Sequence, residues 1–345
     1  MSQWFAEYGL FLAQLVTLVA VILAALAIVS RAKSGQARSQ LRIEELNKRY
    51  RARQRQLRLA GLDKKRRKAV LKAFKRDDKR RDKGDEASGS GQRPTLWVLD
   101  FHGDIKASGT TRLAEEISLI LGVIGEKDEV AIRLESPGGL VHAYGLAAAQ
   151  LDRLRDAGVT TTVCIDKVAA SGGYMMACCA DRLRAAPFAV LGSIGVVAQL
   201  PNIHRLLKRH DVDVELLTAG RYKRTLTVLG ENTQEGREKF IEELESTHEL
   251  FKRFVAERRP VLDIDGIATG ETWYGSQALD KGLIDAVGTS EAYLLERMSD
   301  ARVVTLSLEK RRGVTERLGR AVSRGIEGGL QRVYEALEAS GWQRR

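Results

Sequence analysis

The chain has 345 residues, of which 44% are hydrophobic, so it has room for one large domain with extensions or for two domains. The net charge of +11 is uneven: residues 31–84 hold 22 Lys and Arg against 6 Asp and Glu, which leaves the rest at −5. Aromatic residues do not interleave with these charges, so the composition argues against nucleic-acid binding. Three cysteines, two of them adjacent, exclude a disulfide framework, and no CxxC or His-rich spacing indicates a metal.

An uncharged apolar stretch lies near the N-terminus. Residues 10–29 contain no Asp, Glu, Lys or Arg and are long enough to cross a bilayer core as a helix. A cleaved signal peptide is disfavoured, because no Lys or Arg precedes the stretch. The flanking positive charges begin at Arg31 on its C-terminal side, which predicts a cytoplasmic body, with the periplasmic side as the alternative.

The basic segment that follows is expected to be helical. Residues 31–83 have few apolar positions, and Gly84 to Gly91 has the composition of a flexible linker. The segment is either a solvated spacer or a surface that binds anionic lipid headgroups beside the membrane.

From Pro94 onward, apolar runs of strand length alternate with helical patterns. The expected strands are 96–101, 130–134, 159–165, 182–185, 189–197 and 212–217, and the expected helices are 111–124, 140–157, 171–180 and 233–257. This alternation predicts an α/β fold with a largely parallel sheet, whose sites form at the carboxyl ends of the strands.

The candidate nucleophile is Ser171, in the run Ala169-Ala170-Ser171-Gly172-Gly173-Tyr174. Small neighbours allow a sharp turn that exposes the hydroxyl at the start of a helix. A serine needs a base, and Lys223 can serve if its amine is held neutral; Lys167 is a rival. The N–H of Gly172 and one from the Gly138-Gly139 turn are the candidate oxyanion donors.

These motifs resemble those of the S49 serine peptidases, the signal peptide peptidase A family. The matching runs are Glu135-Ser136-Pro137-Gly138-Gly139, the Ser171 run, Gly192-Ser193-Ile194-Gly195 and Gly220-Arg221-Tyr222-Lys223. The resemblance implies a ClpP/crotonase-like fold, a dyad of Ser171 and Lys223, and an orienting role for Ser193. It also implies an endopeptidase without a cofactor, acting as a homo-oligomer at a bacterial inner membrane on peptides or unfolded proteins, with signal-peptide remnants as one possible substrate.

The composition, together with this resemblance, suggests four regions. They are a membrane anchor (1–30), a basic helical extension and linker (31–92), a peptidase domain (93–299), and a C-terminal strand with an amphipathic helix (300–345). Two alternatives have a different function: a crotonase-type acyl-CoA enzyme, which would not require Ser171 or Lys223, and a catalytically silent membrane scaffold. Whether Lys223 serves its own chain or a neighbouring subunit is left open.

Overall fold

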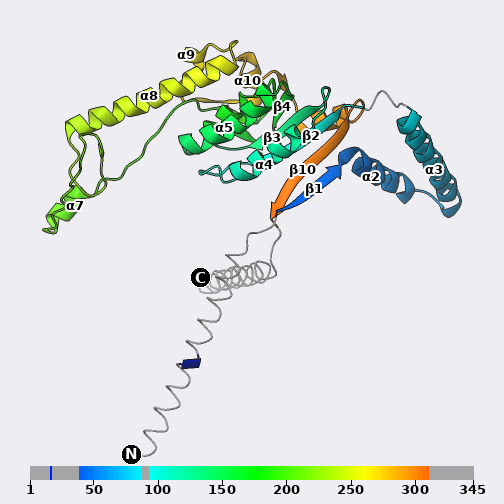
Figure 1. The fold of residues 1–345 in the computed structure, drawn as a ribbon, viewed down its shortest axis with the longest axis horizontal. Coiled ribbons are helices and arrows are strands. Elements are labelled where there is room, and N and C mark those ends of the chain that lie inside the picture. The colour runs from blue at the N-terminus through cyan, green and yellow to red at the C-terminus, as the bar shows by residue number, and fades with distance from the viewer. Residues whose placement is uncertain (1–15, 18–38, 88–92, 311–345) are drawn as a thin grey trace, which may run out of the picture. The chain divides into compact units, whose positions relative to one another are not determined.

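The computed structural model of the protein describes residues 16–17, 39–87 and 93–310 (Figure 1). Residues 42–307 form one compact unit, to which the following description applies; the flanking residues belong to another. Most of the predicted membrane segment, the end of the predicted linker and the C-terminal amphipathic segment lie outside the described residues. Within the described ranges, no helix is both long and apolar enough to cross a membrane.

A seven-stranded sheet forms the centre of the fold. Its order is β1 (Ser39–Glu45), β10 (Arg302–Lys310), β2 (Thr95–His102), β3 (Glu129–Glu135), β4 (Thr160–Ile165), β6 (Arg182–Ala185) and β9 (Ala286–Val287). The pairings from β10 through to β9 are all parallel, and the last residues of β2 and β3, His102 and Glu135, lie opposite each other. The predicted α/β fold with a largely parallel sheet is therefore confirmed.

Alternate residues of the strands face two cores. Leu99, Ile132 and Val163 pack with helices α4 (Thr110–Leu121), α5 (Val141–Asp156) and α6 (Gly172–Ala177). On the other face, a smaller core joins the strands to α11 (Ser290–Arg297) and to Leu46 at the start of α2 (Leu46–Ala60). Both faces of the parallel sheet are thus covered, as parallel sheets require.

A small second sheet is attached to the end of β3. It contains β5 (Val168–Ala170), β7 (Val190–Gly192) and β8 (Thr272–Tyr274), with β5 and β7 parallel and β8 antiparallel to β7. A parallel bridge between Ser136 and Ala169 joins it to the large sheet. The predicted strand 189–197 is shorter than expected, because left-handed backbone at Gly192 and Ser193 ends it. The short helices α9 (Ile264–Ile267) and α10 (Gly275–Asp280) flank β8.

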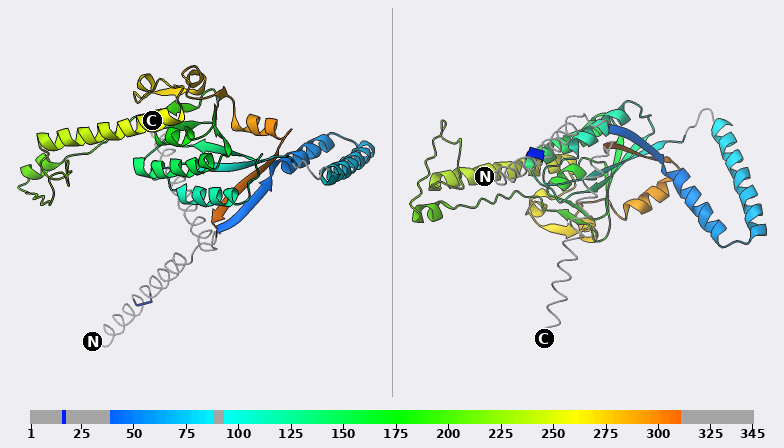
Figure 2. Two further views of the ribbon diagram at one scale, coloured as in Figure 1. Left: turned by 45° about the horizontal axis from the view of Figure 1, so that its top comes forward. Right: turned by 90° about the horizontal axis from the view of Figure 1, so that it is seen from below.

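A helical arm projects from this body. Its elements are α7 (His204–Arg209) and the N-terminal half of α8 (Gln234–Arg258), which lie away from the sheets in all three ribbon views (Figures 1 and 2). At the other end of α8, Val255 is buried in the main core and Arg258 pairs with Asp152 at 2.6 Å. The predicted strand 212–217 is wrong: this segment of the arm is irregular and exposed, with no neighbouring strand to pair with.

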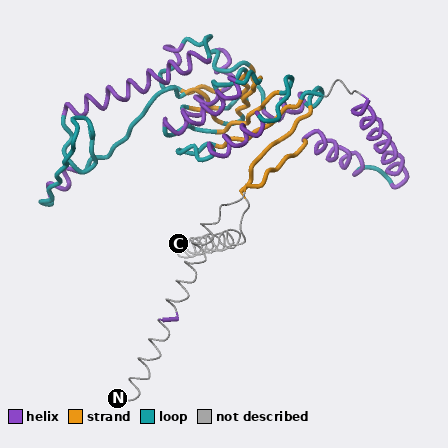
Figure 3. Tube along the Cα trace, viewed as in Figure 1, coloured by secondary structure: helices purple, strands orange, loops and turns teal. Residues whose placement is uncertain are grey.

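The basic segment folds as a strand followed by two helices, α2 and α3 (Lys64–Ala87), as Figure 3 shows. Within the described residues the helical expectation is confirmed except at β1, and α3 continues through Gly84 to Ala87, so the first four residues of the predicted linker are helical instead. Arg55 joins the two helices: its guanidinium contacts both carboxylate oxygens of Asp78 at 2.8 and 2.6 Å and lies over the ring of Phe74. Asn47 ties α2 to the body through the carbonyls of Met298 and Ala301.

Candidate active site

Ser171 lies on the sharp turn between β5 and α6. Its backbone has φ 52° and ψ −122°, a region that residues other than glycine rarely adopt. Such a conformation costs about 1–3 kcal/mol and persists only where its surroundings enforce it. Here the Ser171 N–H donates to the Gly192 carbonyl at 2.8 Å, and the Ser171 carbonyl accepts from the Met175 N–H at 3.0 Å. The serine is therefore held, half-buried, at the N-terminus of α6.

Gly172 is the first residue of α6, so its N–H has no acceptor within the helix. A side chain at this position is impossible without a shift, because a Cβ would overlap the ring of Tyr144. The glycine after the serine thus lets α6 begin against α5 and leaves one backbone donor beside Ser171.

The Gly138 turn lies directly against this donor. Gly138 has φ 91°, and a Cβ there would come within 2.8 Å of both the Gly172 nitrogen and the Ser171 Cβ. The N–H of Gly138 donates to the Ser136 hydroxyl at 3.1 Å. It is thus engaged within the turn, whereas no described acceptor takes the N–H of Gly139. The structure therefore brings together the two predicted sources of backbone donors and distinguishes between the two glycines.

Ser193 lies on a second left-handed turn, with φ 50°. Its N–H donates to the Glu271 carbonyl at 2.6 Å, while the carbonyl of Gly192, one residue earlier, accepts from Ser171. Ser193 is half-buried. The structure thus places Ser193 on the turn next to that of Ser171, and its orienting role toward Lys223 stays a prediction.

Lys223 is not brought to Ser171. It is exposed on the segment between α7 and α8, and within the described residues no hydrogen bond or ion pair connects it to Ser171 or Ser193. Its neighbours hold the segment against the start of α8: Arg221 pairs with Glu235 at 2.7 Å, and the Tyr222 ring lies 5.3 Å from the Lys239 amine.

The length of α8 shows how far this segment is from the body. Glu235 and Lys239 precede the buried Val255 by 20 and 16 residues, which corresponds to about 24–30 Å along a helix. A lysine side chain is far too short to span that separation. In this conformation, therefore, Lys223 and Ser171 of one chain are separate.

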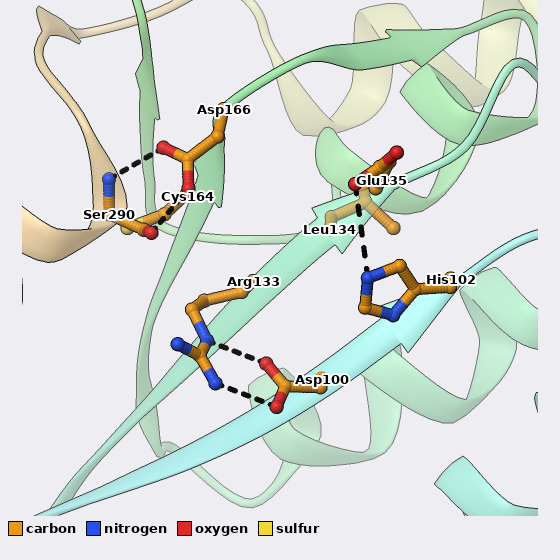
Figure 4. Close-up of a pocket in the computed structure, with 8 residues that line it drawn as sticks. All are labelled: Asp100, His102, Arg133, Leu134, Glu135, Cys164, Asp166 and Ser290. Atoms are coloured by element: carbon orange, nitrogen blue, oxygen red, sulfur yellow. Dashed lines mark hydrogen bonds and ion pairs between the residues drawn. The ribbon is translucent and has the colours of Figure 1, made fainter.

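Lys167, the rival base, points elsewhere. Its amine lies 3.0 Å from both carboxylate oxygens of Glu135, at the carboxyl end of β3. Glu135 also lines an open hollow of about 260 Å³ at the carboxyl ends of β2, β3 and β4, together with His102 (Figure 4). The other residues lining the hollow are Asp100, Arg133, Leu134, Cys164, Asp166 and Ser290. Ser171 is not among them, so this hollow is separate from the candidate active site.

Two buried hydroxyls were missed by the sequence reasoning. Ser136 and Tyr144 are both 0% exposed, and their oxygens lie 2.5 Å apart behind the Gly138 turn. Tyr144 also donates to the carbonyl of Asp104 at 2.8 Å. Ser136 stands inside a motif quoted above, but no feature of the sequence pairs it with a tyrosine on the following helix.

Comparison with known proteins identifies the family. The model of Peptidase family S49 matches residues 153–304, and that of Peptidase family S49 N-terminal matches residues 3–151. The chain is also 50% identical over 327 residues to "Probable protease SohB" of Haemophilus influenzae, covering 91% of each chain. This chain belongs to peptidase family S49. As an S49 protein similar to SohB, it is a protease.

Other members and structures are also similar. The S49 chain is 50% identical over 239 residues to "Probable protease SohB" of Buchnera aphidicola subsp. Acyrthosiphon pisum, covering 69% of this chain and 71% of the relative. Among solved structures, a mutant of the membrane-bound stomatin-specific protease 1510-N matches with a TM-score of 0.40 and 14% identity. That match covers 63% of this S49 chain and 99% of the other.

Proposed function

We propose that this protein is a membrane-anchored serine endopeptidase in which Ser171 is the nucleophile and Lys223 the general base. The observation that carries the proposal is the backbone of Ser171, with φ 52° at the start of a helix. Strained conformations of this kind cluster at active sites, where they expose a reactive group that ordinary backbone would not present. The protease family of the chain supplies the reaction class.

The reaction follows from the groups around this turn. The neutral amine of Lys223 takes the hydroxyl proton of Ser171 as the serine oxygen attacks a peptide carbonyl carbon. The N–H groups of Gly139 and Gly172 donate to the resulting oxyanion, and Ser193 orients the amine. The lysine then gives its proton to the departing amine, and water releases the acyl group from Ser171 by the same steps. No cofactor enters this scheme.

We further propose that Lys223 acts on Ser171 of a neighbouring subunit. Two observations support this arrangement: the lysine segment is held to the outer end of α8, and the arm exposes large apolar side chains. Val197 and Leu217 are 91% and 89% exposed, and Leu206 is 52% exposed. A second copy of the chain that covers this surface would bury the lysine, and burial favours the neutral amine that a base requires.

The membrane position rests on the sequence and on the basic helices. Residues 10–29 are the proposed anchor, with the body on the cytoplasmic side of a bacterial inner membrane. Helix α2 carries six basic and no acidic side chains, and most of the charges on α2 and α3 face solvent. We propose that these helices bind anionic headgroups beside the anchor. The substrates are then peptides or unfolded segments near the membrane, including remnants of signal peptides.

The test is hydrolysis of casein and of fluorogenic peptides by the detergent-solubilised full chain. We expect Ser171→Ala and Lys223→Ala each to lose activity, and Lys167→Ala to retain it. A mixture of Ser171→Ala and Lys223→Ala protein should regain part of the activity, because each pair of unlike subunits contains one intact site. Activity that survives Ser171→Ala would refute the assignment of Ser171 as the nucleophile. Inactive single variants whose mixture stays inactive would refute the arrangement between subunits.

A further inference from the structure

The hydroxyls of Ser136 and Tyr144 belong to one chain of hydrogen bonds whose direction can be deduced. The carbonyl of Asp104 only accepts, so the Tyr144 hydroxyl donates to it. Tyr144 then accepts from the Ser136 hydroxyl. The Ser136 oxygen in turn accepts from the N–H of Gly138. All three protons therefore point the same way, from the Gly138 turn to the loop after β2.

This series of hydrogen bonds is buried inside the protein. Ser136 and Tyr144 are completely buried, and a Cβ at Gly103 would overlap both hydroxyl oxygens. Successive hydrogen bonds strengthen one another in such surroundings, and a broken link leaves a buried polar group unpaired. The conformation of the Gly138 turn is therefore held by the buried hydroxyl of Ser136.

The two backbone donors of the candidate active site, the N–H groups of Gly139 and Gly172, both depend on this series of hydrogen bonds. Because Gly138 gives its N–H to Ser136, the N–H of Gly139 is the donor that remains in the turn. The Tyr144 ring lies against Gly172, where a Cβ would overlap it, and Gly172 carries the other donor. One tyrosine thus contacts the helix start through its ring and holds the Gly138 turn through its hydroxyl.

We propose that Ser136 and Tyr144 are positioning residues for oxyanion stabilisation. They contact neither the substrate nor the reacting atoms; they hold the N–H of Gly139 in line with that of Gly172. The inference rests on the proposed function, since it requires an oxyanion formed by attack of Ser171. Loss of either hydroxyl should lower the rate of the chemical step while substrate binding changes little.

The experiment compares Tyr144→Phe, Ser136→Ala and their double variant in the full-length protein. Tyr144→Phe removes one oxygen and leaves the ring against Gly172. The matched control is Tyr293→Phe, because the Tyr293 hydroxyl is also buried and contacts the Thr162 hydroxyl at 3.2 Å, on the opposite face of the sheet. Each variant is assayed for kcat, KM and thermal stability, and for inhibition by a peptide aldehyde with the substrate's sequence. The serine oxygen adds to the aldehyde carbon and its proton passes to the base, which gives an adduct with an oxyanion-like oxygen.

Removal of a whole oxyanion donor lowers kcat by about 10²–10³-fold, so displacement of one should lower it by about 10–100-fold. We expect that loss in Tyr144→Phe and Ser136→Ala, with KM within about twofold and aldehyde inhibition weakened in proportion to kcat/KM. The double variant should lose little more kcat than the more impaired single variant, because the two hydroxyls belong to the same series of hydrogen bonds. Tyr293→Phe should keep wild-type kcat.

Two results would overturn the inference while the proposed function stands. One is that both variants keep the kcat of Tyr293→Phe; the other is a fall in kcat with no weakening of aldehyde inhibition, which indicates general structural damage. Ser171→Ala protein is assayed in parallel. If it retains activity, the nucleophile assignment is refuted, and the positioning role fails with it.

Discussion

The N–H of Ser171 donates to the carbonyl of Gly192 at 2.8 Å, and this bond connects the two strained turns of the candidate active site. The turns follow β5 and β7, which pair in parallel with Ala170 opposite Gly192. Ser171 and Ser193 therefore leave adjacent strand ends, both with positive φ. The sheet thus enforces conformations that neither serine would adopt alone, and we expect stability and activity to conflict at this point.

Replacement of Ser171 by glycine should make the protein more stable and inactive. Glycine adopts φ 52° without steric cost, and the relief should exceed the extra entropy that glycine loses on folding. We expect the free energy of unfolding to rise by about 1 kcal/mol, measured by urea denaturation of the solubilised chain. Ser171→Ala should be inactive with nearly unchanged stability.

The control for this prediction is Ser118→Gly. Ser118 lies within α4, where glycine is a poor helix former and the hydroxyl's bonds to the Ala114 carbonyl and to Arg153 are lost. Ser118→Gly should therefore lower the stability by about 1 kcal/mol, so the two glycine variants should differ in sign. If Ser171→Gly is as destabilised as Ser118→Gly, the strain at Ser171 is refuted.

Peptidase activity should rise with pH between about pH 6 and about pH 10, because a lysine accepts the serine proton only when its amine is neutral. The hydroxyl of Tyr144 does not produce such a rise, since burial raises the pKa of this tyrosine and it keeps its proton. The measurement is kcat/KM against pH, with protein stability followed over the same range. A flat profile would contradict lysine as the base.

The sequence was sufficient to predict the α/β alternation and the place of Ser171, because both depend on local patterns. Apolar runs bounded by Gly and Pro mark β2, β3 and β4, and small residues around Ser171 permit a turn that only a few residue types allow. Gly138 and Gly172 were expected to meet at the carboxyl ends of parallel strands, but they meet through the short strand β5, which was not predicted and joins the end of β3 by the bridge between Ser136 and Ala169.

The arm shows what local patterns cannot reveal. Residues 212–217 have the apolar composition of a strand, but a strand forms only where a partner lies beside it, and the arm provides none. The distance of Lys223 from the body depends on how far α8 extends beyond its packed end. Similarly, the bond between Ser136 and Tyr144 depends on how α5 packs beside the residue that follows β3. These are tertiary properties with no counterpart in spacing along the chain.

All three cysteines should be unreactive in the folded protein. Cys164, Cys178 and Cys179 are buried, and burial raises the pKa of the Cys164 thiol to about 12, so the reactive thiolate is absent at neutral pH. We expect no rapid reaction with Ellman's reagent near pH 8 and reaction of three thiols per chain in denaturant. Ser299→Cys, at an exposed position after α11, is the control and should add one fast thiol. Fast reaction of the unmodified native protein would contradict the buried placement.

The α2–α3 pair should be shielded by an anionic bilayer and not by a neutral one. The full chain is reconstituted in phosphatidylcholine vesicles with or without phosphatidylglycerol, and hydrogen exchange is followed over residues 46–80. Each Lys or Arg near such a surface contributes about 1 kcal/mol, so exchange should slow with phosphatidylglycerol and recover in about 1 M salt. Lys64→Gln with Lys65→Gln should reduce the protection, whereas Lys127→Gln with Arg155→Gln, at exposed sites on the body, should not. Equal exchange in both vesicles would mean that the helices are a solvated spacer, because charges that touch the headgroups cannot be indifferent to headgroup charge.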